Sequence, residues 1–321
     1  MEGLERRPQT DPQFRNDVLT GLAAPIPAVP ARWLYNHRGS ELFEAITRLP
    51  EYYPTRTEMG LLERIGEDLA AAIAPGQALV EFGSGSSTKT PILIRAIRPA
   101  AYVPIDISGD FLRVSAEALQ AQFPQLPVHP VEGDFMRRID LPTDVTGLAN
   151  VGFFPGSTIG NLVARTAVDL LRAMKETLGE GSRLIIGMDR IKDVDVLVSA
   201  YDDAAGVTAQ FNLNLLHRIN EELDGDIEIE AFRHRAIWND DLSRIEMHLE
   251  AMRDVSFHVA GHPFSFPAGA TIHTENSHKY GYRDSRILLR AAGWGVVSEW
   301  TDEQEYFSIL LAEAEPPRFA P

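Results

Sequence analysis

The stretch that most constrains this chain is a short apolar run that breaks into a glycine-rich turn. Residues 78–82 are apolar except for Glu81, Gly83 and Gly85 follow, and residues 88–97 have a helical pattern. Glycine has no Cβ, so the backbone can turn sharply there and approach a ligand closely. The helix behind the turn presents free N–H groups and the positive end of its dipole. The stretch predicts strand, ligand-binding turn and helix, although a lone Gly-x-Gly suits a plain tight turn equally well.

The chemistry of this turn favours S-adenosylmethionine over a pyrophosphate. The third glycine of a Gly-x-Gly-x-x-Gly turn is absent, and Glu81 stands just before the turn, where it can accept from a ligand amine or hydroxyl. S-adenosylmethionine carries a sulfonium, an ammonium and a ribose, and it has no phosphate that needs a dense nest of N–H groups. We therefore expect this cofactor at Glu81, Gly83 and Gly85.

Acidic residues also follow the next two expected strands. Residues 101–106 end in Asp106, and residues 128–132 lead to Asp134 and Phe135. In doubly wound sheets an acid after the second strand binds ribose hydroxyls. An acid beside an aromatic ring can bind and stack an adenine. Each signal is weak alone, but three successive strand ends of this kind indicate a nucleoside-containing ligand.

Composition excludes several classes of protein. A chain of 321 residues forms one large domain or two ordinary ones. Its 30 Lys and Arg against 46 Asp and Glu give a net charge of −16, which argues against nucleic acid and anionic membranes as partners. No run approaches the roughly 20 apolar residues that span a bilayer, and no signal peptide is recognisable. The absence of Cys excludes disulfides and thiolate chemistry. We expect a cytoplasmic protein.

The order of the expected elements predicts an α/β fold. A fourth strand begins at residue 150 and a fifth covers residues 183–188, after which the alternation of strands and helices stops. Helices follow at 194–223, strands at 228–238 and 243–259, a loop-rich segment at 263–282, and two closing strands at 296–301 and 307–314. This is the layout of a class I (Rossmann-like) methyltransferase sheet with a closing antiparallel strand pair.

We also expect a second α+β domain, built from the N-terminal helices and an insertion. The S-adenosylmethionine-binding methyltransferase domain would cover residues 57–192 and 287–321, and the substrate-binding domain residues 12–56 and 193–286. Within the N-terminal part, Ser40 is the expected N-cap of a helix over 41–48. Thr55 and Glu58 have the spacing of a capping box that starts a helix at residue 56.

Five stretches together resemble one family, the S-adenosylmethionine-dependent histidine Nα-methyltransferases of ergothioneine biosynthesis. The stretches are residues 49–58, 81–85, 156–161, 200–208 and 274–280. The resemblance extends from about Trp33 to the last strands, and the first and third stretches are long and unusual. It implies that L-histidine receives three methyl groups on its α-nitrogen, giving hercynine.

The resemblance also implies residue roles. The cofactor would be held by Gly83, Lys89, Asp106, Asp134 and Phe135, in addition to Glu81 and Gly85. The amino acid would be held by Tyr52, Asn161, Tyr201, Glu275 and Ser277, with Gly156 and Tyr35 close to the amine.

The chemistry of amine methylation fits these residue types. The amine must lose a proton before it attacks, and we expect Tyr35, Tyr52 and ordered water to assist without one strong base. Asn161 and Tyr201 offer neutral donors to the substrate carboxylate. Glu275 and Ser277 form the expected specificity pair for the imidazole, because a side chain that cannot donate would leave a buried carboxylate unpaired. Aromatic packing, a turn role and a solvated loop acid are the ordinary alternatives for these residues.

Other interpretations remain open at this point. An α-amine methyltransferase for another amino acid would share the turn and differ at Glu275 and Ser277, and a non-catalytic S-adenosylmethionine-binding module would share the fold. A Rossmann dehydrogenase would need the third glycine and a hydride-transfer partner. His258 and His262 are four apart but lack a His-Glu-x-x-His pattern, and His234, His248 and His278 are expected to be structural, so no metal is predicted. We expect a monomer.

Overall fold

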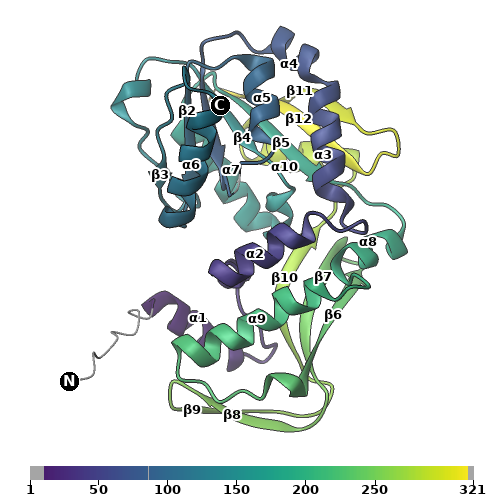
Figure 1. Cartoon of the computed structure of the whole chain (residues 1–321). Coiled ribbons are helices and arrows are strands. Elements are labelled where there is room, and N and C mark those ends of the chain that lie inside the picture. The colour runs from purple at the N-terminus through teal and green to yellow at the C-terminus, as the bar shows by residue number, and fades with distance from the viewer. Residues whose placement is uncertain (1–10, 86, 317–321) are drawn as a thin grey trace, which may run out of the picture. The chain divides into compact units, whose positions relative to one another are not determined.

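The chain consists of two compact units (Figure 1). The computed structural model describes residues 11–85 and 87–316. Unit 1 contains the residues up to Tyr53 together with Lys192–Ser277, and unit 2 contains Pro54–Ile191 together with the residues from His278 onward. The expected frayed segment lies mostly outside the described residues. Among the helices that the structure describes, none has the length and apolar character to cross a membrane.

Unit 2 is built on a seven-stranded sheet. Its strands are β1 (Ala78–Phe82), β2 (Ala101–Asp106), β3 (Val131–Glu132), β4 (Asn150–Phe154), β5 (Arg183–Asp189), β11 (Trp294–Thr301) and β12 (Phe307–Ala314). Their order is β11-β12-β5-β4-β1-β2-β3. Strands β3, β2, β1, β4 and β5 pair in parallel, whereas β12 pairs antiparallel with β5 and β11. The predicted methyltransferase sheet with its closing antiparallel pair is confirmed.

Helices cover both faces of this sheet. They are α3 (Tyr53–Arg64), α4 (Gly66–Ala72), α5 (Thr90–Ile97), α6 (Gly109–Gln122), α7 (Ala164–Leu178) and α10 (Tyr282–Ala291), with short 3₁₀ turns η2 (Thr143–Val145) and η3 (Thr158–Asn161). Successive strand residues point to opposite faces, so Leu79 packs with α3, α4 and α5 while Val80 packs with α7 and α10. All five residues of β1 are buried, as expected for a central parallel strand.

Unit 1 combines helices with a small antiparallel sheet. Its helices are α1 (Pro12–Leu22), α2 (His37–Ile46), α8 (Val194–Tyr201) and α9 (Val207–Glu222), with 3₁₀ turns η1 (Ala31–Leu34) and η4 (Ile229–Ala231). Its strands are β6 (Phe232–Asn239), β7 (Arg244–Ala251), β8 (Val255–Val259), β9 (His262–Phe266) and β10 (Thr271–His278). A three-stranded sheet has the order β10-β7-β6, and β8 pairs with β9. Helix α9 packs on α2 and on strands β6 and β7.

Both expected helix starts in the N-terminal part are wrong. Helix α2 begins at His37 because Asn36 is its N-cap, with Asn36 Oδ1 accepting from the Gly39 N–H at 2.8 Å. Helix α3 begins at Tyr53, since the first turn tolerates Pro54. Glu58 therefore lies one turn inside the helix, where it is free to bond elsewhere. A break at Ile65 separates α3 from α4, so the single helix expected there is also wrong.

The interpretation of residues 243–282 also needs correction. Strand β7 ends at Ala251, and the chain then forms the hairpin β8–β9 and strand β10 where a loop-rich segment was expected. Glu275 and Ser277 accordingly lie on a buried strand and not on a loop. Sequence patterns missed β10 because polar residues fill it on both faces, so that it lacks the apolar alternation of an ordinary half-buried strand.

Candidate active site

The glycine turn after β1 adopts the backbone that its sequence demands. Gly83 and Gly85 have φ values of +70° and +49°, a region that side chains with Cβ rarely enter. The Gly83 N–H donates to the Ile105 carbonyl at 2.8 Å, and the Gly85 N–H donates to Asp106 Oδ2 at 3.1 Å. A Cβ on Gly83 would lie 3.4 Å from Phe135 Cε1, so the Phe135 ring borders the turn. The structure thus brings these four predicted cofactor residues together.

Two predicted acids stand at the ends of β2 and β3. Asp106 is half-buried, and its Oδ1 accepts from the Ser108 N–H at 3.0 Å while its Oδ2 holds Gly85. Asp134 is exposed, and its Oδ1 accepts from the Met136 N–H at 3.0 Å. These bonds to the backbone fix each carboxylate and leave lone pairs for a ligand.

Glu81 is the most buried of the predicted cofactor residues. It is 1% exposed, and its Oε2 accepts from the Thr90 hydroxyl at 2.6 Å and from the Tyr102 hydroxyl at 2.5 Å. Burial raises the pKa of Glu81 to about 7, and the hydrogen bonds from Thr90 and Tyr102 oppose that rise. Because these internal partners occupy Oε2, a direct contact of Glu81 with the cofactor stays a prediction.

Lys89 is held by an acid that sequence reasoning assigned elsewhere. The Lys89 ammonium lies 2.5 Å from Glu58 Oε2, and their side chains are 12% and 0% exposed. The Gly156 N–H also donates to Glu58, at 3.1 Å to Oε1 and 2.8 Å to Oε2. Glu58 is therefore not a capping-box residue. Its spacing from Thr55 misled the sequence analysis, and nothing local distinguishes a carboxylate that turns into the protein.

The loop between β4 and α7 is held at several points. Gly156 has a φ of +79°, and Ser157 Oγ accepts from the Asp189 N–H at 2.9 Å. His278 Nδ1 donates to the Gly160 carbonyl at 2.9 Å. A Cβ on Gly160 would lie 2.8 Å from the His278 carbonyl oxygen. Asn161, half-buried at the end of η3, thus follows a closely packed loop.

Lys279 and Asp189 form a buried ion pair next to this loop. Lys279 Nζ lies 2.8 Å from Asp189 Oδ2, with the side chains 0% and 1% exposed. Asp189 ends β5, and its backbone N–H holds Ser157. The 274–280 stretch and the 156–161 stretch, which are far apart in sequence, therefore meet in unit 2 through His278 and Lys279.

The predicted aromatic residues of unit 1 form one cluster. The Tyr52 and Tyr201 rings lie 6.1 Å apart, and the Tyr201 hydroxyl bonds Ser277 Oγ at 2.7 Å. Phe43 joins Tyr52 at 6.2 Å and Tyr35 at 5.6 Å. Phe211 also joins this cluster, 5.4 Å from Tyr35. Sequence reasoning missed both phenylalanines, because each looks like an ordinary apolar position on an amphipathic helix.

Glu275 acts electrically on Tyr35. Removal of water around the phenol raises the pKa of Tyr35 well above its ordinary value, and the charge of Glu275 adds to that rise. The ring still keeps 36% of its surface exposed, so the effect concerns the hydroxyl more than the ring. Glu275 itself is 9% exposed on β10. Tyr35 is consequently a protonated phenol at neutral pH, able to donate or accept a hydrogen bond but not to serve as a strong base.

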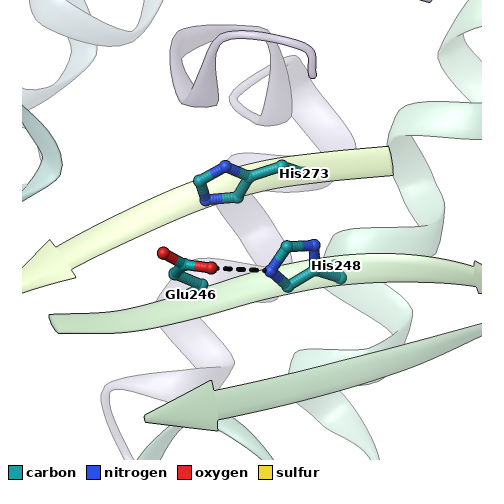
Figure 2. Close-up of side chains that lie close together, drawn as sticks. All are labelled: Glu246, His248 and His273. Carbon is teal, nitrogen blue, oxygen red and sulfur yellow. Dashed lines mark hydrogen bonds and ion pairs between the residues drawn. The ribbon is translucent and has the colours of Figure 1, made fainter. Parts of the chain in front are cut away.

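One cluster with metal-ligand residue types lies on the sheet of unit 1. Figure 2 shows Glu246 and His248 on β7 and His273 on β10, with ligand atoms that all lie within 4.8 Å of one another. The two imidazoles stack, with centroids 4.7 Å apart. Glu246 also binds the Arg244 guanidinium at 2.6 Å. Sequence reasoning missed this cluster because its members come from two strands.

The charges within this cluster are satisfied without an ion. Burial alone would raise the pKa of Glu246, but hydrogen bonds from Arg244, Asn239 and His248 outweigh it and lower the pKa to about 2. The guanidinium already supplies the positive charge that a cation would bring. Stacked rings also cannot both aim their in-plane lone pairs at one ion. We therefore assign no metal here.

Comparison with known proteins identifies the family. Residues 14–314 match the model of the histidine-specific methyltransferases that depend on S-adenosylmethionine. The chain belongs to this family. The histidine N-alpha-methyltransferase of Mycolicibacterium smegmatis is 41% identical over 305 residues, covering 93% of this chain and 94% of that protein. The corresponding protein of Mycobacterium tuberculosis is 39% identical over 306 residues, with the same coverage. Ergothioneine biosynthesis protein 1 of Neurospora crassa is 30% identical over 295 residues, which are 89% of this chain and 33% of that protein.

The glycine turn of this methyltransferase fits its cofactor. The turn leaves open backbone at Gly85, where a Cβ would meet nothing within 4 Å. Phe135 offers an aromatic face for an adenine, and Asp106 offers carboxylate lone pairs for ribose hydroxyls. Lys89 is the one cation among the seven predicted cofactor residues, and it matches the one anion of S-adenosylmethionine, its carboxylate.

Proposed function

We propose that this chain transfers three methyl groups from S-adenosylmethionine to the α-nitrogen of L-histidine, giving hercynine in ergothioneine biosynthesis. The observation that carries the proposal is the 41% identity with a histidine N-alpha-methyltransferase over 94% of that protein. The clustering of Tyr35, Tyr52, Tyr201 and Ser277 in unit 1 supports it. In this proposal unit 2 binds the cofactor and unit 1 supplies most of the amino-acid contacts.

The protein's main contribution is positioning. S-adenosylmethionine, when bound, supplies a methyl group that is already activated by its sulfonium, so the chain must chiefly align donor and acceptor. We assign Lys89 to the cofactor carboxylate, Asp106 to the ribose, and Asp134 with Phe135 to the adenine. Asn161 and Tyr201 would donate to the substrate carboxylate, and neutral donors suit a site that also holds a sulfonium.

Loss of a proton from the α-amine is the chemical task left to the chain. A free α-amine has a pKa of about 8, so most histidine arrives protonated at neutral pH. Tyr35 and Tyr52 accept a hydrogen bond from the amine and pass its proton toward water. The raised pKa of Tyr35 suits this role, because a neutral phenol orients the amine without becoming a base. Aromatic faces also accommodate the quaternary ammonium that the third transfer creates.

Recognition of the imidazole falls to Glu275 and Ser277. Glu275 is 9% exposed and Ser277 is 3% exposed on the same strand, β10. Glu275 would accept from a ring N–H of histidine. An amino acid whose side chain cannot donate would leave this buried carboxylate without compensation, which is a strong basis for rejection.

A product assay tests the proposal. The chain is incubated with S-adenosylmethionine and each free amino acid, and products are identified by mass spectrometry. Trimethylated histidine as the sole product is the expected result. Methylation of a different amino acid would keep the cofactor site and overturn the roles of Glu275 and Ser277. Cofactor binding without any methylation would indicate a non-catalytic binding module.

We further propose that the protein works as a cytoplasmic monomer. The net charge of −16 and the absence of Cys support a cytoplasmic location. The large exposed apolar side chains are scattered over both units and support a monomer. Light scattering across a concentration series tests the monomer, and a mass that doubles with concentration would overturn it.

A further inference from the structure

Glu58 is a fully buried carboxylate to which none of the proposed roles is assigned. It lies inside helix α3 and is 0% exposed. Three contacts surround it within unit 2: the Lys89 ammonium at 2.5 Å and the Gly156 N–H at 3.1 and 2.8 Å from its two oxygens. A buried charge is tolerated only when it is paired and hydrogen-bonded, so these contacts require one another.

The two partners of Glu58 belong to two different ligand segments. Lys89 stands at the N-cap of α5, directly after the glycine turn that follows β1. Gly156 begins the loop that follows β4 and leads to Asn161. Strands β1 and β4 are parallel neighbours, so their turns leave the same edge of the sheet. One carboxylate therefore joins the cofactor turn to the loop that carries predicted amino-acid contacts.

The sheet leaves space for this carboxylate. A Cβ on Gly187 of β5 would lie 2.1 Å from Glu58 Oε1 and 2.9 Å from Phe307 Cε1. Gly187 has no positive φ to explain its glycine. The missing side chain thus provides the room that Glu58 occupies. The charges of Lys89 and Glu58 also reach Glu81, so the three ionisable groups form one buried network under the turn.

We propose that Glu58 is a positioning residue that aims the Lys89 ammonium at the cofactor carboxylate and fixes the Gly156 loop beside it. This inference rests on the proposed function. It adds to that function a role in which Glu58 touches neither cofactor nor substrate and acts through Lys89 and Gly156. Binding of cofactor then depends on a residue that the sequence alone assigns to a helix cap.

A double-mutant cycle tests the Lys89 part of the proposal. The variants are Glu58→Gln, Lys89→Met and the double variant, and S-adenosylmethionine affinity is measured by titration calorimetry. Gln keeps the size of the side chain and removes the charge. We expect Glu58→Gln to weaken binding at least tenfold, and the double variant to bind no more weakly than Lys89→Met. Losses that add in the double variant would overturn the proposal, because Glu58 would then act independently of Lys89.

The Gly156 part is read from turnover. At saturating S-adenosylmethionine and histidine, Glu58→Gln should lower kcat at least tenfold, whereas a purely structural role would lower the melting temperature and leave kcat intact at low temperature. Glu63→Gln is the matched control, since Glu63 is exposed on the same helix. It should match the wild type in affinity and kcat.

A second variant covers a failure of Glu58→Gln to fold. Gly187→Ala keeps the carboxylate and displaces it, and should also weaken cofactor binding at least tenfold. Wild-type affinity and kcat in folded Glu58→Gln or Gly187→Ala would overturn the inference. A wild-type protein that binds no S-adenosylmethionine would instead overturn the proposed function, so the two failures are distinguishable.

Discussion

The turns of unit 2 and the strand β10 of unit 1 present their functional groups in different ways. In unit 2 the backbone does most of the work: Gly83, Gly85 and Gly156 adopt positive φ, and buried carboxylates hold their N–H groups. In unit 1 the groups are side chains, because Glu275 and Ser277 project from one strand toward an aromatic cluster. Backbone sites tolerate varied side chains and fail when geometry changes. Side-chain sites fail when one group is removed.

Removal of the Glu275 carboxylate should have the largest effect and would sharpen this contrast. Glu275→Ala should weaken histidine binding by roughly 10- to 100-fold, because a hydrogen bond to a charged group contributes about 1.5–3 kcal/mol. S-adenosylmethionine affinity should change less than twofold. Titration calorimetry measures both, with Glu221→Ala on the exposed face of α9 as control. Unchanged histidine affinity would remove the specificity role of Glu275.

A change of geometry in the unit 2 loop tests the other side of the comparison. Gly160→Ala should destabilise the protein by about 1–3 kcal/mol, since its Cβ would meet the His278 carbonyl oxygen at 2.8 Å. Gly60→Ala is the matched control. A Cβ there meets nothing within 4 Å, so Ala in helix α3 should stabilise by about 0.5–1 kcal/mol. Urea unfolding measures both, and equal stability of the two variants would contradict the close packing of the loop.

The tyrosine hydroxyls test whether the aromatic cluster has chemistry beyond packing. Replacement of both Tyr35 and Tyr52 by Phe should lower kcat about tenfold near neutral pH, because the amine then lacks its acceptors. The deficit should shrink as pH rises past about 8, where free histidine already carries a neutral amine. A rate profile between pH 6.5 and 9.5 measures this. A profile that matches the wild type would leave these rings with a packing role alone.

Acid should weaken unit 1 more gently. Burial lowers the pKa of His234 and of His273, so the unfolded chain binds protons more readily than the folded one. Their contribution to stability is complete above the unfolded pKa of about 6.5 and declines as the pH falls below it. Urea unfolding from pH 8 to pH 5.5 measures the decline. His234→Gln should flatten it, and a variant that keeps the wild-type slope would exclude His234 as a source.

Much of unit 2 could be predicted because its signals are local. The apolar run of β1, the glycine turn and the boundaries of α7 and β12 each follow from neighbouring residues. Strand β10 could not be predicted in this way. Its polar residues find partners from distant elements, as Thr274 does with Asn212 on α9 at 2.6 Å and Ser277 does with Tyr201.

By itself the sequence determined the fold class, the glycine turn, the cofactor type and the family, because each depends on residue order or on a motif of a few neighbours. Only the tertiary structure decided where Glu58 and Glu81 point and that Phe43 and Phe211 join the tyrosines. The physical reason is that a buried polar group is stable only beside its partners. Glu58 lies 31 residues from Lys89 and 98 from Gly156, so its role exists only in the folded chain.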